Sequence, residues 1–335
     1  MLGRAIARLV VALLAPALAL QRSAFAPATV GAGDDACADM SDECGAWAVA
    51  GECEANPRHM KVSCAASCGS CDWASAERRC ALDPRALPAV APGDINRTFA
   101  RIEALGEYAP RVLSREPWVV VLDAFLSAEE ADALVAIANR DGGSHFVSSQ
   151  SGGAGTPTGM VNPVVSEHRR SATQWCADGC WNESAVERVL SRAQALLRVP
   201  RGSCEPLQLL RYEQGDYYRL HSDYVPEQRA LPCGPRAITL FLYLTENLEG
   251  GHTTFPRLGL SIAPKKGRAA LWPSTLSDSP TVVDLRTVHA AEPVLGAAGS
   301  ALKLSANLWV HTGDFMAARE RACTGVQAPP PPSAR

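Results

Sequence analysis

The sequence has no strong bias of charge and no long basic block. Its 32 Lys and Arg nearly balance 35 Asp and Glu, which gives a formal net charge of −3. Proteins that bind nucleic acid usually carry a concentrated positive surface, so this composition argues against a nucleic-acid partner. Internal repeats are also missing. Apolar residues make up 47% of the 335 residues. This content excludes wholesale disorder and is enough for the cores of about two domains.

Long apolar runs are missing after the N-terminus. Arg4 and Arg8 precede an apolar run over residues 9–20, and small residues follow. Charged residues, a short apolar run and small residues in this order are typical of a secretory signal, which we expect over residues 1–26. An uncleaved membrane anchor is the alternative, although Pro16 interrupts the run and a bilayer span needs about 20 apolar residues.

Cysteine is abundant, with 12 residues in the chain. Six of them fall within residues 37–71, a density that indicates an oxidising compartment unless the cluster binds metal. Sequons for N-glycosylation begin at Asn96 and Asn182 and fit a lumenal glycoprotein. Together with the N-terminal signal, these features predict the endoplasmic reticulum lumen or the secretory pathway.

The N-terminal cysteines lie in a stretch with hardly any apolar core, so the stretch needs covalent links to stay folded. Three disulfides would supply them. A zinc site that uses Cys64, Cys68 and Cys71 is the alternative, but zinc fingers belong mostly to reducing compartments. Spacing alone leaves the pairing open. The six residues are Cys37, Cys44, Cys53, Cys64, Cys68 and Cys71.

Residues 36–72 resemble a ShK-toxin-type domain, including the pieces Gly51-Glu52-Cys53 and Asn56-Pro57. Toxin members of that family block potassium channels with a Lys–Tyr pair, whereas this segment has a single Lys and no Tyr. We therefore expect a docking or spacer module rather than a channel blocker. The resemblance implies the disulfides Cys37–Cys71, Cys44–Cys64 and Cys53–Cys68.

Two further segments have weak patterns. Residues 73–116 carry scattered Pro, Ala and charged residues, and we interpret them as a linker with one short helix. Residues 324–335 contain the run Pro329–Pro332, which predicts a proline-rich disordered tail.

The region between them reads as strands with a few helices. Residues 118–122 form a β-branched apolar run typical of a buried strand. A capping box over 127–130 predicts a helix to about residue 139, and residues 183–197 predict a second amphipathic helix. The glycine-rich stretch 142–163 predicts a long mobile loop of the kind that often covers a site.

Strand patterns dominate from residue 207 onward. Apolar residues alternate over 238–244 and again over 303–311. In the second run, Lys303, Trp309 and His311 share one face with other polar residues, and such a face must line solvent or a cavity. Many short strands with flanking helices predict a mainly β fold, of the jelly-roll or barrel type.

One pair of polar residues suggests a metal site. His221 and Asp223 are separated by one residue, so on a strand both side chains point from the same face. His289 ends another predicted strand and supplies the third donor. Two His and one carboxylate form the facial triad of non-haem Fe(II) oxygenases, which leaves coordination positions open for a cosubstrate and O₂.

Residues 117–315 resemble the catalytic domain of prolyl 4-hydroxylases in the short plant and algal style, within the 2-oxoglutarate/Fe(II) dioxygenases. The resemblance implies a double-stranded β-helix, or jelly roll, with flanking helices. The matching pieces run in the family's order. They are VVVLDAFLSAEEADALVAIA, RRSATQW, EPLQLLRYEQGDYYRLHSDY, RAITLFLYLTENLEGGHTTFP, PKKGRAALWP, VHAAEPV and KLSANLWVH.

Position by position, the resemblance gives roles to eight residues. His221, Asp223 and His289 would hold iron. Related lysyl and prolyl 3-hydroxylases carry Arg where this chain has Lys303, so that residue favours the 4-hydroxylase branch. The stretch between His289 and Lys303 is longer than the family pattern, which predicts a lengthened hairpin turn. Lys303 would pair with the distal carboxylate of 2-oxoglutarate, Tyr212 would hydrogen-bond it, and Arg236 and Trp309 would face the peptide substrate with His311 nearby.

The resemblance implies an oxidoreductase of the procollagen-proline 4-dioxygenase type. It would use Fe(II), 2-oxoglutarate and O₂ to convert peptidyl proline to 4-hydroxyproline, releasing succinate and CO₂, and ascorbate would restore oxidised iron. The expected substrate is a proline-rich or collagen-like peptide. The alternatives are another 2-oxoglutarate-dependent peptidyl hydroxylase and a non-catalytic secreted binding protein, and the triad with Lys303 favours the enzyme.

Six cysteines lie outside the N-terminal cluster. Cys176 and Cys180 are close enough for a disulfide that closes a short loop, and the even count would allow every thiol to pair. The six are Cys80, Cys176, Cys180, Cys204, Cys233 and Cys323.

Overall fold

The computed structural model describes residues 37–149, 151–155, 161–164, 167–246, 249–296 and 302–325. The expected signal over 1–26 lies outside these residues. Within the described ranges, no helix combines the length and the apolar character that crossing a bilayer requires.

A small disulfide-linked module opens the described chain. Its three disulfides join Cys37 to Cys71, Cys44 to Cys64 and Cys53 to Cys68, which confirms the expected pairing. Met60 packs with two of these disulfides in a small core of its own. The module contains α1 (Cys44–Val49), α2 (Glu52–Ala55), α3 (Pro57–Ser63) and α4 (Cys71–Ala74).

The expected linker over 73–116 is shorter than the sequence suggested. After α5 (Ala76–Arg79), the chain forms α6 (Asp94–Leu105) and β1 (Pro110–Arg115). Helix α6 buries Ile95, Phe99 and Ile102 in the main core, so residues 94–115 belong to the catalytic domain. The spacing of these three residues places them on one helix face. The charged residues between them obscured this periodic pattern in the sequence.

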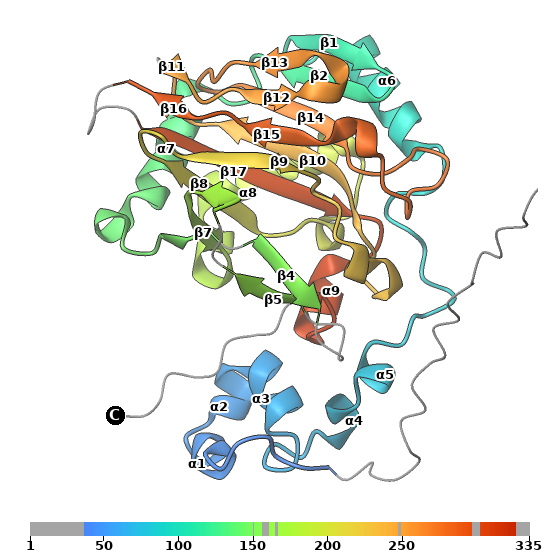
Figure 1. The fold of residues 1–335 in the computed structure, drawn as a ribbon. Coiled ribbons are helices and arrows are strands. Elements are labelled where there is room, and N and C mark those ends of the chain that lie inside the picture. Colours follow the sequence, from blue (N-terminus) through green and yellow to red (C-terminus); the bar gives the residue numbers. More distant parts are fainter. Residues whose placement is uncertain are drawn as a thin grey trace, which may run out of the picture. The chain divides into compact units, whose positions relative to one another are not determined.

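A large antiparallel sheet forms the centre of the catalytic domain (Figure 1). Its strand order is β1-β2-β14-β10-β17-β8-β7-β3. Besides β1, the strands are β2 (Trp118–Leu122), β3 (Val147–Ser148), β7 (Ala172–Cys176), β8 (Leu207–Tyr212), β10 (Arg236–Tyr243), β14 (Ala269–Pro273) and β17 (Lys303–His311).

A smaller sheet packs against the large one, and the two together make the expected jelly roll. Its order is β13-β12-β15-β9-β6, and aromatic residues such as Phe241 and Trp272 fill the space between the sheets. The strands are β6 (Arg169–Arg170), β9 (Tyr217–His221), β12 (Thr253–Phe255), β13 (Leu260–Ile262) and β15 (His289–Ala291), with β11 (Glu249–Gly250) and β16 (Val294–Leu295) paired beside them.

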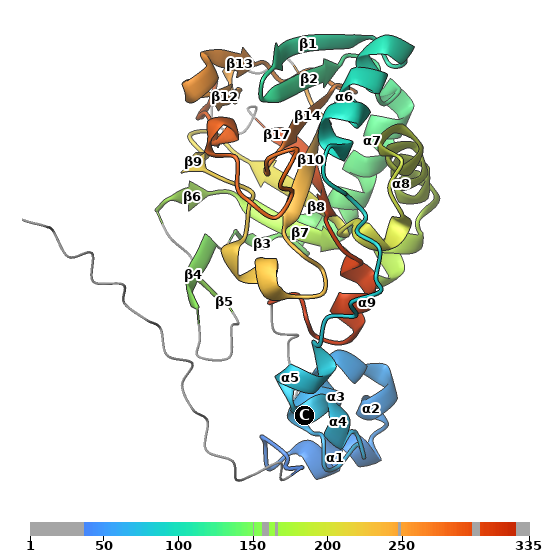
Figure 2. The same ribbon diagram turned by 90° about the vertical axis from the view of Figure 1, so that its right-hand side faces the viewer.

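Helices cover the outer face of the large sheet (Figure 2), where α6 is joined by α7 (Ala128–Ala138) and α8 (Ser184–Leu197). The predicted capping box is present, since the side chains of Ser127 and Glu130 each bond to the other's backbone N–H. Apolar residues of β17 enter the core under these helices, while its polar face is equally buried on the inner side. That inner face lines a cavity. Of the two possibilities that the sequence left open for the polar face of residues 303–311, the structure therefore shows the cavity and not solvent.

The expected loop over 142–163 contains strands. Strand β3 lies in it, and β4 (Ser151–Gly155) pairs antiparallel with β5 (Val161–Val164). The glycine content hid the pairing, because glycine carries no side chain to show an alternating pattern.

Disulfides outside the module differ in part from expectation. Cys176 pairs with Cys180 as expected, and Cys80 pairs with Cys323 across 243 residues. Cys204 and Cys233 are free and buried, so the full pairing that the even count would allow does not occur. Burial raises the pKa of both thiols to about 12, which keeps them unreactive. The final helix, α9 (Phe315–Glu320), precedes Cys323.

Candidate active site

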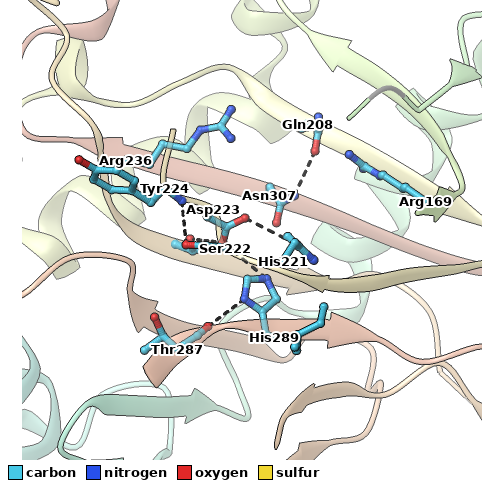
Figure 3. A network of polar contacts seen from close by, with 12 residues as sticks. Arg169, Gln208, His221, Ser222, Asp223, Tyr224, Arg236, Thr287, His289 and Asn307 are labelled. Atoms are coloured by element: carbon cyan, nitrogen blue, oxygen red, sulfur yellow. Dashed lines mark hydrogen bonds and ion pairs between the residues drawn. The ribbon is translucent and has the colours of Figure 1, made fainter. Parts of the chain in front are cut away.

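Two neighbouring strands of the small sheet bring the predicted metal ligands together. Strand β9 pairs antiparallel with β15, and the register sets His221 directly opposite His289. Asp223 follows β9 by two residues, and its carboxylate lies 4.0 Å from Nε2 of His221 and 3.6 Å from Nε2 of His289. One donor atom from each residue lies within 4.8 Å of the other two. Figure 3 shows the three side chains converging.

Backbone carbonyls determine which nitrogen each histidine offers. Nδ1 of His221 lies 2.8 Å from the carbonyl oxygen of Arg219, and Nδ1 of His289 lies 3.1 Å from that of Thr287. A carbonyl oxygen only accepts hydrogen bonds, so each Nδ1 carries the proton and donates it. The lone pair of each Nε2 therefore points to the shared centre, the arrangement typical of metal-bound histidines.

The electrostatics of the three residues favour cation binding. Burial, followed by the charge of His289, lowers the pKa of His221 well below its usual range, so this imidazole is neutral. Burial alone would raise the pKa of Asp223, but the two histidines and a 2.7 Å hydrogen bond from Thr239 lower it. Two imidazoles and one carboxylate fit Fe(II) with open coordination positions.

A cavity of about 480 Å³ opens over these ligands. It is wide enough for a small dicarboxylate and part of a peptide. Three other residues that the sequence suggested, Tyr212, Arg236 and Trp309, line its wall. The structure thus brings the metal ligands and these predicted contact residues to one place.

Lys303 lies beneath this wall and is almost completely buried, at 1% exposure. Its ammonium donates a 2.7 Å hydrogen bond to the carbonyl of Gly251 and lies 5.0 Å from the ring centre of Tyr212. Within the described ranges it has no carboxylate partner. Burial lowers its pKa from 10.5 to about 7. Lys303 does not itself line the cavity, but the rings of Tyr212 and Phe241 beside it do.

The register of the large sheet supports this placement. Lys303 is paired directly with Tyr212 across β17 and β8, so both side chains lie on the inner face. The lengthened turn expected between His289 and Lys303 centres on residues 297–301, which lie outside the described residues.

Arg236 is held in a rigid position at the cavity wall. Its guanidinium makes two hydrogen bonds to Glu205, of 2.6 and 3.1 Å, and lies 3.5 Å from the ring centre of Trp309. Burial alone would raise the pKa of Glu205, but the charge of Arg236 and hydrogen bonds from His311 and Arg236 hold it at about 2. Sequence reasoning missed Glu205, whose only signal was an acidic residue beside an apolar strand.

His311 does not contact the cavity, contrary to expectation. It is completely buried, and its ring nitrogens bond to the carbonyl of Gly234 at 2.7 Å and to Glu205 at 2.6 Å. His311 therefore supports Glu205, which in turn positions Arg236.

Arg169 is a further cation that sequence reasoning did not identify as a site residue. It lines the cavity, is 7% exposed and lies 4.5 Å from the ring centre of Tyr218. Its guanidinium donates to the hydroxyls of Ser171 and Thr173, at 3.0 and 3.4 Å. In the described part of the chain it has no carboxylate within 4.0 Å. Both hydroxyl partners lie within four residues of it, in the piece RRSATQW that matches the family, but the sequence alone gave Arg169 no role.

Comparisons with known proteins agree with this geometry. The 2OG-Fe(II) oxygenase superfamily model matches residues 207–311, and the ShK domain-like model matches residues 36–71. Prolyl 4-hydroxylase 1 of Arabidopsis thaliana is 31% identical over 230 residues, which cover 64% of this chain and 76% of that protein. Probable prolyl 4-hydroxylase 3 of the same plant is 29% identical over 238 residues, covering 64% and 77%.

Among solved structures, the viral collagen prolyl hydroxylase from Paramecium Bursaria Chlorella virus-1 aligns with 26% identity and a TM-score of 0.44, over 58% of this chain and 96% of that one. The sequence matches extend well beyond the metal ligands and cover most of the plant enzymes. With two histidines and an aspartate converging in a cavity, they show that the chain belongs to the prolyl 4-hydroxylase family of 2-oxoglutarate/Fe(II) oxygenases.

Proposed function

We propose that this chain is a 2-oxoglutarate- and Fe(II)-dependent dioxygenase that converts peptidyl proline to 4-hydroxyproline. The observation that carries the proposal is the convergence of His221, Asp223 and His289, with both Nε2 lone pairs directed to one point at the floor of a cavity. When bound, Fe(II) and 2-oxoglutarate supply the oxidising chemistry for hydroxylation, with release of succinate and CO₂.

Lys303 and Tyr212 are the residues proposed to bind the far carboxylate of 2-oxoglutarate. The Lys303 ammonium is desolvated and has one carbonyl acceptor, so an incoming carboxylate would supply its missing counter-charge. The Tyr212 hydroxyl lies in the same wall and offers a neutral donor, since burial raises the pKa of its phenol. Lys303 and Tyr212 are 1% and 2% exposed, so solvent has little access to either side chain.

The peptide would bind against the aromatic residues of the cavity wall. The rings of Trp175 and Trp309 lie 6.0 Å apart and both line it. Proline-rich peptides adopt an extended left-handed helix that packs well on such rings. Arg236, fixed by Glu205 and stacked on Trp309, would donate hydrogen bonds to peptide carbonyls. These features support a proline-rich or collagen-like substrate.

The cellular setting is part of the proposal. Five disulfides in the described residues fit an oxidising compartment. With the N-terminal signal or anchor and the sequons at Asn96 and Asn182, they support action in the endoplasmic reticulum lumen or secretory pathway. Ascorbate would restore oxidised iron there, and the ShK-like module would serve as a docking or spacer unit.

Turnover with defined peptides tests the proposal. Purified chain with Fe(II), 2-oxoglutarate and ascorbate is incubated with poly-proline or collagen-like peptide, and succinate release is compared with peptide mass. The expected result is one oxygen atom gained by the peptide for each succinate formed. Succinate formed without any modified proline in either peptide would contradict the proposed substrate class.

A further inference from the structure

The chain leaves the catalytic domain through the wall of the active-site cavity. Thr324 and Gly325, the last described residues, line the same cavity as His221, Asp223 and His289. Thr324 is 5% exposed, although the sequence placed it in a disordered tail.

Two contacts fix this exit point. The carbonyl of Thr324 accepts a 3.1 Å hydrogen bond from Nε2 of Gln228, a buried residue of the short helix Pro226–Ala230 that also lines the cavity. Cys323, one residue earlier, is joined to Cys80 by a disulfide. Whatever follows Gly325 therefore starts at the cavity.

The residues that follow have the composition of the proposed substrate. Residues 326–335 read VQAPPPPSAR, with four successive prolines from Pro329 to Pro332. Such a run favours the polyproline II conformation, which rises about 3.1 Å per residue. The first proline is the fourth residue after Gly325, so the run can reach roughly 12 to 22 Å from the exit point. The aromatic peptide site formed by Trp175 and Trp309 lines the same cavity.

Because the C-terminal segment is joined to the domain that carries the peptide site, it can occupy that site even if its intrinsic affinity is weak. A peptide joined to its site by a few residues experiences an effective concentration on the order of millimolar. We propose that residues 326–335 bind in the peptide site of their own chain and are hydroxylated there. The chain would then be its own substrate, and the segment would compete with external peptides.

This inference rests on the proposed function, and the reaction would consume the same 2-oxoglutarate and O₂. A C4–H bond of a tail proline breaks and a C–O bond forms, with one atom of O₂ entering proline and the other entering succinate. Oxidative decarboxylation of 2-oxoglutarate and oxidation of the C–H bond each supply two of the four electrons that reduce O₂.

Mass spectrometry of the tail tests the covalent step. The full chain is incubated with Fe(II), 2-oxoglutarate and ascorbate, then reduced and digested with trypsin, which releases residues 322–335 as one peptide. We expect this peptide to gain at least one oxygen atom, with a first-order rate constant that stays unchanged over a tenfold range of chain concentration. A His289→Ala chain, mixed with a chain in which Pro329, Pro330, Pro331 and Pro332 are all changed to Ala, should remain unmodified.

Peptide binding gives a second measurement that needs no turnover. Fluorescence anisotropy of a labelled VQAPPPPSAR peptide is measured with the full chain and with the four-Ala variant, in the absence of 2-oxoglutarate. If the free peptide binds with a dissociation constant near 0.1 mM, the tethered prolines should weaken its binding to the full chain by about tenfold. The four-Ala variant should bind the peptide without this competition.

The outcomes separate the inference from the proposed function. External poly-proline converted while the tail stays unmodified would overturn the inference and leave the function standing. Tail modification whose rate rises with chain concentration, or equal peptide affinity in both chains, would overturn binding in cis. If neither tail nor external peptide is modified, both the inference and the proposed function are wrong.

Discussion

At the scale of single residues, the metal ligands depend on hydrogen bonds from neighbours that never touch the metal. Backbone carbonyls hold the protons of His221 and His289 on Nδ1, and the Thr239 hydroxyl donates to Asp223. Thr239 is completely buried, so no water can replace its hydroxyl. These contacts orient all three donors before any ion arrives.

Removing the Thr239 hydroxyl should weaken iron binding. In Thr239→Val the side-chain volume is nearly kept, but Asp223 loses a donor, and such a loss typically reduces metal affinity about 10- to 100-fold. Titration of the purified chain with Fe(II) under nitrogen measures the effect. Thr239→Ser, which restores the hydroxyl, should bind almost as tightly as the native chain, and equal affinity in the Val variant would refute this role.

Lys303 should make binding of 2-oxoglutarate depend on pH. Its pKa in the empty site is about 7 because burial disfavours the charged form, and a carboxylate ligand needs that charge. Above pH 7 the dissociation constant of 2-oxoglutarate should therefore rise about tenfold per pH unit, with one proton taken up on binding. The ligand-free fold should instead gain stability from pH 7 to 10.5, because there the folded chain binds fewer protons than the unfolded chain.

Two variants separate charge from position. Lys303→Arg should bind 2-oxoglutarate more weakly but without this pH dependence, since a guanidinium stays charged. Below pH 7, where native Lys303 is charged, Lys303→Ala should bind 2-oxoglutarate at least tenfold more weakly than the native chain, because an unpaired buried carboxylate costs about 2–5 kcal/mol. Calorimetry in two buffers of different ionisation enthalpy measures both affinity and proton uptake. Native affinity in the Ala variant would exclude Lys303 from the cosubstrate site.

At the scale of elements, strong periodic patterns were predictable and long-range pairings were not. Strand β2, helices α7 and α8 and strand β17 lie where alternation or capping placed them. His221 and Asp223 were predictable from their one-residue separation, although Asp223 lies two residues beyond the end of β9, and His289 was predictable from its place at the end of another strand pattern and from the family resemblance. Glu205 was missed because its partners, Arg236 and His311, lie on distant strands, and the Cys80–Cys323 disulfide spans 243 residues.

Helix α6 was assigned to a linker, and its core contact can be tested. Phe99 is completely buried and packs 5.9 Å from the ring centre of Trp118 on β2. Phe99→Ala should lower the free energy of unfolding of the catalytic domain by about 3–5 kcal/mol, as measured by denaturant unfolding. Leu105→Ala on the same helix is the control, since Leu105 is 52% exposed and should change stability by less than about 0.5 kcal/mol. Similarly small losses of stability in both variants would show that α6 belongs to the linker and not to the core of the catalytic domain.

At the scale of the whole molecule, the N-terminal module has its own core and its own three disulfides. Cys80, which follows the module, is linked to Cys323, beside the exit of the tail. The chain thus has a covalent link between the segment after the module and the segment whose last described residues line the active-site cavity.

A chain that begins at residue 76 should fold without the module. It keeps the Cys80–Cys323 disulfide and both sheets, so its circular dichroism and its turnover of a short proline peptide should match those of the full chain. Differences should be confined to long substrates or to localisation. A truncated chain that is insoluble or inactive on the short peptide would show that the module is part of the catalytic fold.

The central claim is that His221, Asp223 and His289 form an iron site that hydroxylates proline. The most direct measurement compares bound Fe(II) and hydroxyproline formed in a poly-proline peptide for the native chain, His289→Ala and His252→Ala. His252 hydrogen-bonds Ser261 at 2.8 Å and lies outside the ligand cluster. We predict one bound Fe(II) and full turnover for the native chain and for His252→Ala, and loss of both in His289→Ala, which keeps too few donors. Undiminished hydroxyproline formation by His289→Ala would contradict the account.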